Sequence, residues 1–148
     1  PGFEKKVEYL RNCAKYRMVT KKYLTFGRLW EPIYPDNEVP VFEEEFRGGG
    51  THIGIAPAVE ARLWQAEDGD IAIFIANYVD KEVSFSYSLD PADYGLTSDT
   101  YQIVEITPEG NKSIGESGKS ISRTETLAPN KVKVIEFKPT GQTVMNNK

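Results

Sequence analysis

The spacing of hydrophobic residues changes near residue 41, and this change restricts the possible folds more than any other feature. Between residues 41 and 139, apolar residues recur at every second position in short runs separated by turn residues, most clearly in Val83–Leu89. A period of two is typical of a strand with one face on a core and the other in water. Seven or eight such strands without intervening helices predict a mainly β fold, an antiparallel β-sandwich over residues 41–139, and exclude a parallel α/β sheet.

The individual strands follow from runs of alternating or continuous apolar residues bounded by turn signals. We expect strands at Val41 to Phe46, Val59 to Ala66, Ile71 to Asn77, Val83 to Leu89, Tyr101 to Thr107, Ile121 to Leu127 and Val132 to Phe137, and a weak strand around Ser113 and Ile114. The run 71–77 is apolar on both faces, which predicts a central strand. Asp90-Pro91 followed by Gly95 predicts one capped helical turn. The glycines at 48–50 predict a flexible loop, and residues 140–148 a disordered tail.

Residues 1–27 carry the one strong helical pattern, over residues 3–24, with Gly27 as the predicted stop. Two apolar stripes lie side by side on this helix. The first comprises Phe3, Val7, Leu10 and Ala14, and the second comprises Tyr9, Cys13, Tyr16 and Tyr23. Because so wide a surface normally contacts more than one layer, we expect part of it to stay uncovered, or to be covered by another copy in a homodimer.

Residues 28–40 contain three prolines, so this segment is predicted to be a stiff, extended connector that neither continues the helix nor lies inside a sheet. The chain begins with Pro1-Gly2 and lacks an initiator methionine, from which we expect that a preceding part has been removed.

Composition excludes several classes of function. The net charge of -4 provides no basic stripe for nucleic acid, and no apolar run reaches the roughly 18 residues of a membrane span. With one cysteine, Cys13, and one histidine, His52, a structural zinc site is excluded, and no cofactor-binding motif occurs. Cys13 fits a small buried apolar position. A single cysteine leaves the compartment open, including a secreted or periplasmic parent protein.

Catalytic residues are not identifiable from these patterns. Glu43 and Glu45 share one strand face about 6.5 to 7 Å apart, between the two spacings that glycosidases use, and are interpreted as a charged edge. His52 follows three glycines and is predicted to lie on a surface loop, because the chain has no nucleophile elbow. The acidic residues Glu60, Glu67, Asp68 and Asp70 lack the spacing of a calcium loop, and we interpret them as turn residues.

Aromatic residues are the remaining candidates for a binding site, because sugar rings stack their apolar faces on exposed aromatic side chains. The candidates are Trp30, Tyr34, Trp64 and Tyr78. The alternative for each of them is packing in the core or between layers.

Several stretches resemble one known family. Cys13-Ala-Lys-Tyr-Arg17 and Tyr23-Leu-Thr-Phe-Gly-Arg28 resemble the end of the catalytic barrel in a family of predicted bacterial glycoside hydrolases, classed as a domain of unknown function. In that family a C-terminal sandwich follows the last barrel helix. The stretches similar to its strands are Ala61-Arg-Leu-Trp-Gln-Ala-Glu-Asp-Gly69, Ile71-Ala-Ile-Phe-Ile-Ala-Asn77, Ser88-Leu-Asp-Pro91 and Val134-Ile-Glu-Phe137.

The resemblance implies that the catalytic carboxylates belong to a barrel preceding Pro1. We therefore expect a non-catalytic accessory sandwich that packs against the barrel of its parent protein and does not hydrolyse aryl glycosides by itself. The alternatives are a carbohydrate-binding module that uses its exposed aromatic residues, and a hydrolase with an unrecognised site.

Overall fold

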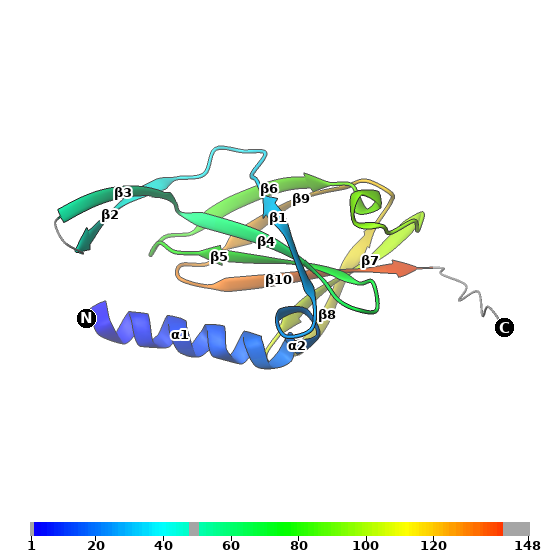
Figure 1. Cartoon of the computed structure of the whole chain (residues 1–148), viewed down its shortest axis with the longest axis horizontal. Helices are drawn as coiled ribbons and strands as arrows, with labels where there is room; N and C mark the ends of the chain where they lie inside the picture. The colour runs from blue at the N-terminus through cyan, green and yellow to red at the C-terminus, as the bar shows by residue number, and fades with distance from the viewer. Residues whose placement is uncertain (1, 48–50, 141–148) are drawn as a thin grey trace.

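The structure is a computed structural model, which describes residues 2–47 and 51–140 (Figure 1). Two helices, α1 (Gly2–Val19) and α2 (Lys21–Leu24), precede the strands. The strands are β1 (Arg28–Ile33), β2 (Val41–Arg47), β3 (Thr51–Pro57), β4 (Val59–Gln65), β5 (Ile71–Asn77), β6 (Val83–Leu89), β7 (Thr100–Thr107), β8 (Gly110–Ser117), β9 (Ile121–Leu127) and β10 (Val132–Thr140).

All strand pairs are antiparallel, which confirms the predicted mainly β fold class. Six strands form one sheet in the order β1-β4-β5-β10-β7-β8, and two further pairs, β2-β3 and β6-β9, stand apart from it. The predicted central position of residues 71–77 is confirmed, since β5 lies between β4 and β10.

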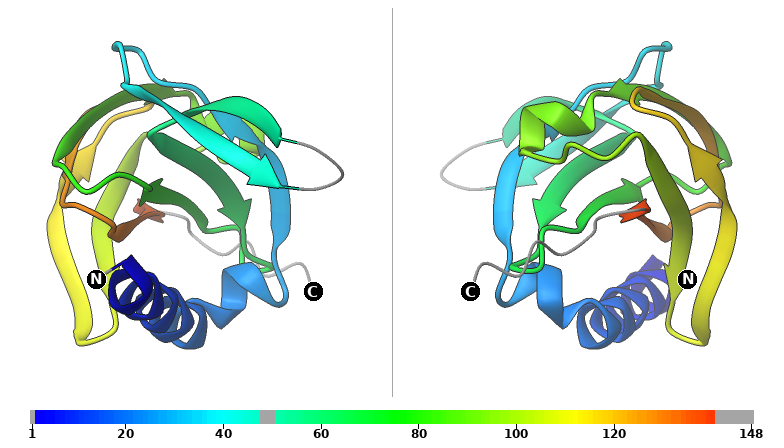
Figure 2. Two further views of the ribbon diagram at one scale, coloured as in Figure 1. Left: turned by 90° about the vertical axis from the view of Figure 1, so that its left-hand side faces the viewer. Right: turned by 90° about the vertical axis from the view of Figure 1, so that its right-hand side faces the viewer.

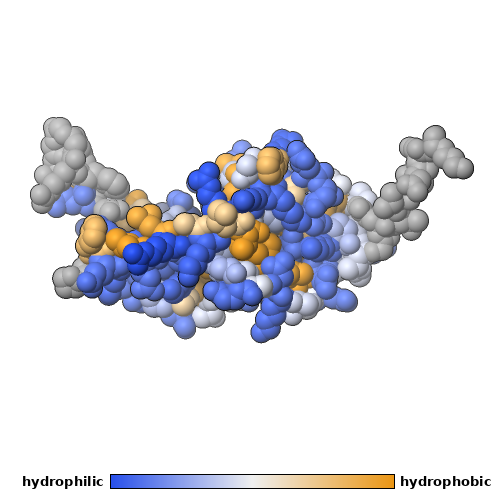
Figure 3. Space-filling view, turned by 90° about the horizontal axis from the view of Figure 1, so that it is seen from below, coloured by the Kyte–Doolittle hydropathy of each residue, from blue (hydrophilic) through white to orange (hydrophobic). Residues whose placement is uncertain are grey.

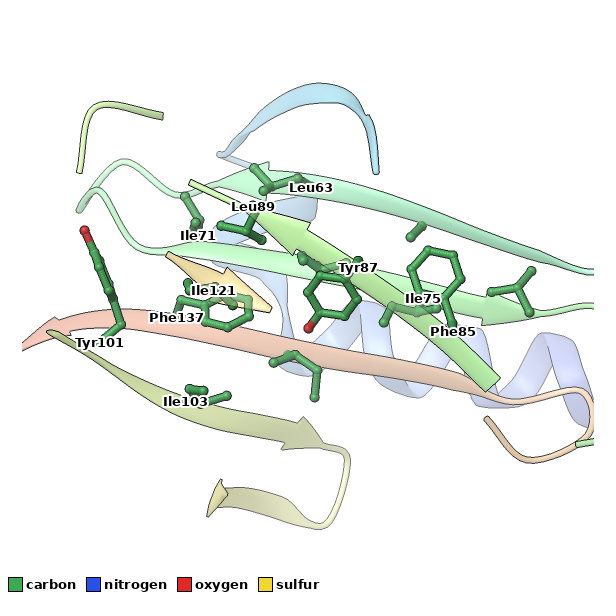
Figure 4. Packing of buried hydrophobic residues seen from close by; sticks show 14 of the residues in the cluster. Leu63, Ile71, Ile75, Phe85, Tyr87, Leu89, Tyr101, Ile103, Ile121 and Phe137 are labelled. Carbon is green, nitrogen blue, oxygen red and sulfur yellow. The ribbon is translucent and has the colours of Figure 1, made fainter. Parts of the chain in front are cut away.

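The main core lies between the six-stranded sheet and the β6-β9 pair. Four alternate residues of β6 point into this core, and Figure 4 shows Phe85, Tyr87 and Leu89 facing the sheet. On the opposite face of β6 the serines pair with hydroxyls of β9, as in the 2.8 Å contact between Ser86 Oγ and Thr124 Oγ1. The alternation seen in the sequence therefore separates a buried face from a hydroxyl-lined one.

A second, smaller core lies on the other face of the same sheet. The helix α1 lies along this face, and both end views place it between the edges formed by β1 and β8 (Figure 2). Tyr16 and Tyr23 pack here on Ala72, Val134 and other residues of the sheet. The helix, the sheet and the β6-β9 pair thus form three layers.

The predicted capped turn after β6 is confirmed. Asp90 accepts a 2.9 Å hydrogen bond from the backbone N–H of Ala92, and Pro91 opens the 3-10 turn η1 (Pro91–Tyr94). Gly95 closes it with a φ of 79°, a left-handed conformation that glycine adopts without strain.

The prediction of one helix over residues 3–24 is wrong in one respect, because the helix breaks at Thr20. The buried Thr20 side chain donates a 2.7 Å hydrogen bond to the Tyr16 carbonyl, and its backbone leaves the helical conformation. Hydroxyls bonded back to the preceding turn favour such bends. The bend redirects α2, which places Tyr23 fully inside the second core.

The prediction that residues 28–40 stay outside the sheet is wrong for residues 28–33, which form β1. This strand occupies an edge, and the pairing with β4 is irregular between Leu29 and Pro32. A proline is tolerated there because an edge strand has one side without ladder hydrogen bonds. Residues 34–40 then lead into β2.

The segment after the glycines forms a strand that the sequence patterns do not predict. This strand, β3, pairs with β2 over the whole length of both, and we call this pair the arm. The weak strand predicted near Ser113 is a full strand, β8. The predicted glycine loop at 48–50 and residues 141–148 of the predicted tail lie outside the described residues.

Candidate functional site

A groove runs along one flank of α1, where the helix meets the sheet and the arm. It consists of a cavity of about 600 Å³ near the start of the helix and a neighbouring cavity of about 230 Å³ further along, and Tyr78 lines both. Aromatic side chains from five segments line them: Tyr9 and Tyr16 of α1, Phe42 of β2, Trp64 of β4, Phe74 of β5, and Tyr78 directly after β5. We call these two cavities the aromatic trough. Figure 3 shows the α1 face, where apolar patches lie among charged side chains.

Tyr78 lies at the centre of the trough. Its ring meets the Tyr9 ring edge-on at 6.4 Å between centroids, and its hydroxyl donates a 3.4 Å hydrogen bond to Glu60. The pKa of Tyr78 is raised, mainly by burial and to a lesser extent by the charge of Glu60. The pKa of Tyr9 is also raised, mainly by burial and to a lesser extent by a hydrogen bond with Cys13. Both phenols therefore keep their protons at neutral pH, and the Tyr78 proton is already donated to Glu60.

Charged and amide groups surround these rings. Lys6, Asp80 and Asn130 line the larger cavity, and Glu60 and Arg62 line the smaller one. The trough thus combines apolar ring surfaces with hydrogen-bond donors and hydrogen-bond acceptors. This combination is common in sites for polar small molecules.

The structure brings together two of the four aromatic residues predicted as candidates. Trp64 and Tyr78 both line the trough. Trp30 packs edge-on against Tyr94 at 5.2 Å between centroids, under the Arg28 guanidinium at 4.0 Å, and it belongs to the margin of the main core.

Tyr34 is 75% exposed and lines a separate hollow of about 240 Å³. Tyr9, Tyr16 and Phe42 also line the trough, although the sequence patterns do not single them out as binding residues. Tyr9 and Tyr16 belong to the second apolar stripe of the helix, and that stripe is the sequence signal for this flank.

The acidic candidates are placed as follows. Glu43 and Glu45 lie on an exposed face of the arm, where they pair across to Ile55 and Ile53. Asp68 and Asp70 form the turn between β4 and β5, since the Asp68 carboxylate accepts a 3.1 Å hydrogen bond from the Asp70 N–H. His52 belongs to β3, and its side chain lies outside the described part of the chain.

A buried ionic cluster, not foreseen from the sequence, attaches α2 to the sheet. Glu136 of β10 is 1% exposed and accepts a 2.6 Å hydrogen bond from the Tyr23 hydroxyl. The Lys22 ammonium lies 2.8 Å from the same carboxylate and 2.7 Å from Asp70. Lys138 pairs with the second Glu136 oxygen at 3.2 Å. The cluster therefore neutralises a carboxylate that water does not reach.

A second buried carboxylate lies on the other side of the sheet. Glu125 of β9 is bound by Arg123 at 2.7 Å and by Lys133 at 2.6 Å. Each of the two buried glutamates is thus held by two cations. Removing one partner of such a group is destabilising because it leaves a buried charge uncompensated, which favours a structural role for both.

The ionic cluster predicts a loss of stability at alkaline pH. Burial is the main cause that raises the Tyr23 pKa above 10.0, and the hydrogen bond to Glu136 is the second. Burial by itself lowers the Lys22 pKa, but hydrogen bonds to Asp70 and Glu136 outweigh it and raise that pKa above 10.5. Both groups bind their protons more tightly when folded, so their stabilisation is complete below about pH 10 and declines as the pH rises towards the folded pKa values.

Urea unfolding between about pH 9 and about pH 11.5 measures this decline. In the double variant Lys22→Met, Tyr23→Phe, the free energy of unfolding should depend less on pH across that range. If the free energy of unfolding depends on pH equally in the natural chain and in the double variant, Lys22 and Tyr23 are not the cause of the alkaline loss of stability.

Within residues 2–47 and 51–140, no helix is long and apolar enough to cross a membrane. In the same part of the chain, no group of three or more histidine, cysteine, aspartate or glutamate side chains is arranged to hold a metal ion.

The fold and the trough define a mainly β sandwich domain with a helix on one face and a groove along that helix. No protein-family model matches the sequence. No curated protein matches it either.

Solved structures of glycoside hydrolases resemble part of the chain. One is a candidate α-N-acetylgalactosaminidase from Bacillus halodurans C-125, with a TM-score of 0.46 and 14% identity over 66% of this chain and 21% of that one. Two others are structures of a family 27 β-L-arabinopyranosidase from Geobacillus stearothermophilus, one of them with arabinose bound. Their TM-scores are 0.43, at 14% identity over 67% and 68% of this chain and 20% of theirs. The chain spans about a fifth of the length of each.

Proposed function

We propose that this chain is a non-catalytic accessory domain of a glycoside hydrolase, and that it packs through α1 against a catalytic barrel of the same parent protein. The observation that carries the proposal is the helix with two apolar sides. On one side of α1, Tyr16 packs against the second core and Tyr9 contacts Tyr78, which follows β5. A separate apolar stripe, at spacings typical of one helix face, lies in water.

The uncovered stripe is substantial. Phe3 is 79% exposed, Leu10 is 65% exposed and Met18 is 63% exposed. Each large apolar side chain that leaves water stabilises a folded assembly by about 1.5 to 3 kcal/mol, so covering this stripe would be strongly favourable. The exposure confirms the expectation that part of the helix stays uncovered. A homodimer through the same stripe stays a prediction.

The glycoside hydrolase part of the proposal rests on the resemblance of the helix and strand motifs to that family. Two features support the non-catalytic part. The buried glutamates are neutralised by lysine and arginine, and the exposed pair Glu43 and Glu45 faces outward from the arm.

The test uses the parent protein, with the sequence that precedes residue 1 in its gene. That sequence should show the alternating strand and helix patterns of a barrel. A natural start codon directly before the codon for Pro1 would overturn the proposal. In the parent, the double variant Leu10→Lys, Met18→Lys should lower the midpoint of thermal unfolding by several degrees, because two apolar contacts are lost.

The same pair of changes in the 148-residue chain should alter the free energy of unfolding by no more than about 0.5 kcal/mol, since both side chains are already in water. Lys15→Ala, on an exposed flank of the same helix, is the matched control in both proteins. A parent protein that tolerates the double variant as well as the control would contradict packing through this stripe.

A further inference from the structure

We infer that the aromatic trough is a binding site for an oligosaccharide chain. The inference goes beyond the proposed function, because it concerns the flank of α1 beside Tyr78 and not the stripe that contains Phe3 and Met18. Leu10 belongs to the stripe and also lines the larger cavity. The two functions are therefore separated by Met18→Lys, which changes the stripe outside the trough, and by Tyr78→Ala, which changes the trough outside the stripe.

The trough has the dimensions of a ligand site. The larger cavity, of about 600 Å³, falls within the usual range of about 300 to 1,000 Å³ for small-molecule sites. The lining runs along α1 from Lys5 to Tyr16, which corresponds to about 16 Å of helix. Two neighbouring cavities over this length, joined at Tyr78, suit several sugar rings in a row better than a single compact ligand.

The chemistry of the lining selects a sugar over other occupants. A pyranose ring has apolar C–H faces, which stack on aromatic rings, and a rim of hydroxyls, which need donors and acceptors. Tyr9, Tyr78 and Trp64 supply rings along the trough, while Glu60 and Arg62 lie beside them. An apolar helix seated here would desolvate those charges without pairing them, which is unfavourable.

The central ring is accessible and fixed in orientation. Tyr78 is 41% exposed, and it is held by its edge-on contact with Tyr9 and its hydrogen bond to Glu60. Nearby, Lys5 and Asp80 form a loose ion pair at 4.0 Å, with both side chains largely in water. Ligand hydroxyls can replace such an exposed pair at little energetic cost.

The test is titration of the 148-residue chain with cellotetraose, xylotetraose, mannotetraose, β-1,4-galactotetraose and maltotetraose, followed by calorimetry and by tryptophan fluorescence. At least one of these should bind with a Kd of about 1 mM or tighter. Because Trp64 lines the trough, that ligand should also change the tryptophan emission. If none binds more tightly than about 10 mM, the inference is overturned.

Variants locate the binding. Tyr78→Ala should weaken binding about tenfold, while Tyr78→Phe, which keeps the ring, should stay within about twofold of the natural chain. Phe26→Ala removes a 63% exposed aromatic ring outside the trough and should leave the Kd unchanged. Circular dichroism verifies that each variant is folded. Equal effects of Tyr78→Ala and Phe26→Ala, or no effect of Tyr78→Ala, would place the ligand elsewhere and overturn the assignment.

Discussion

Replacement of Gly27 by alanine is expected to lower the free energy of unfolding by about 3 kcal/mol or more. Gly27 lies where the chain leaves α2 and passes against the end of β4. A Cβ atom at this position would lie 2.5 Å from the Tyr23 carbonyl oxygen and 2.7 Å from the Gln65 carbonyl oxygen. Both neighbours are backbone atoms, so the clash with the new Cβ atom can be removed only if the helix and the sheet move apart.

The control for this prediction is Gly118→Ala, because a Cβ there would have no heavy atom within 4 Å. That variant should differ from the natural chain by no more than about 0.5 kcal/mol. Urea unfolding gives the global difference, and hydrogen exchange of the α1 and α2 amides shows whether the helices detach before the sandwich unfolds. If the two alanine variants are equally stable and equally protected, the close approach at Gly27 has no energetic importance.

Replacement of Tyr23 by alanine should destabilise the fold by about 3 to 5 kcal/mol, the range for removal of a large buried aromatic side chain. Tyr23 is fully buried in the second core, where its ring meets Phe74 at 6.1 Å between centroids. Its hydroxyl also donates to the buried Glu136 carboxylate. The substitution therefore removes ring contacts and one hydrogen bond to a charge together.

Two further variants separate these contributions. Tyr23→Phe keeps the ring and loses only the hydrogen bond to a charged acceptor, which should lower the free energy of unfolding by about 1.5 to 3 kcal/mol. Tyr34→Ala removes a tyrosine that is 75% exposed and should change it by no more than about 0.5 kcal/mol. Thermal and urea unfolding measure all three variants. A Tyr23→Ala variant as stable as Tyr34→Ala would show that α2 does not anchor the helix to the sheet.

Tertiary structure alone determined the groups that form the candidate site and the anchor of α2. Tyr23 and Glu136 are 113 positions apart in the sequence, and nothing near either residue indicates that they meet. The same holds for Phe42 and Tyr9, which line one cavity from the arm and from the helix. Sequence patterns report which face of an element is apolar, whereas these contacts depend on how whole elements pack, which local spacing does not encode.

Local chemistry, by contrast, was sufficient for most elements of the fold. The serine alternation of Val83–Leu89 predicted β6, and Asp90, Pro91 and Gly95 predicted the turn after it, because period-two burial and capping each act within a few residues. Local sequence patterns did not predict the strands β1 and β3. Pro32 in β1 and Gly54 in β3 are poor strand formers, and each strand exists because a neighbouring strand supplies its hydrogen bonds.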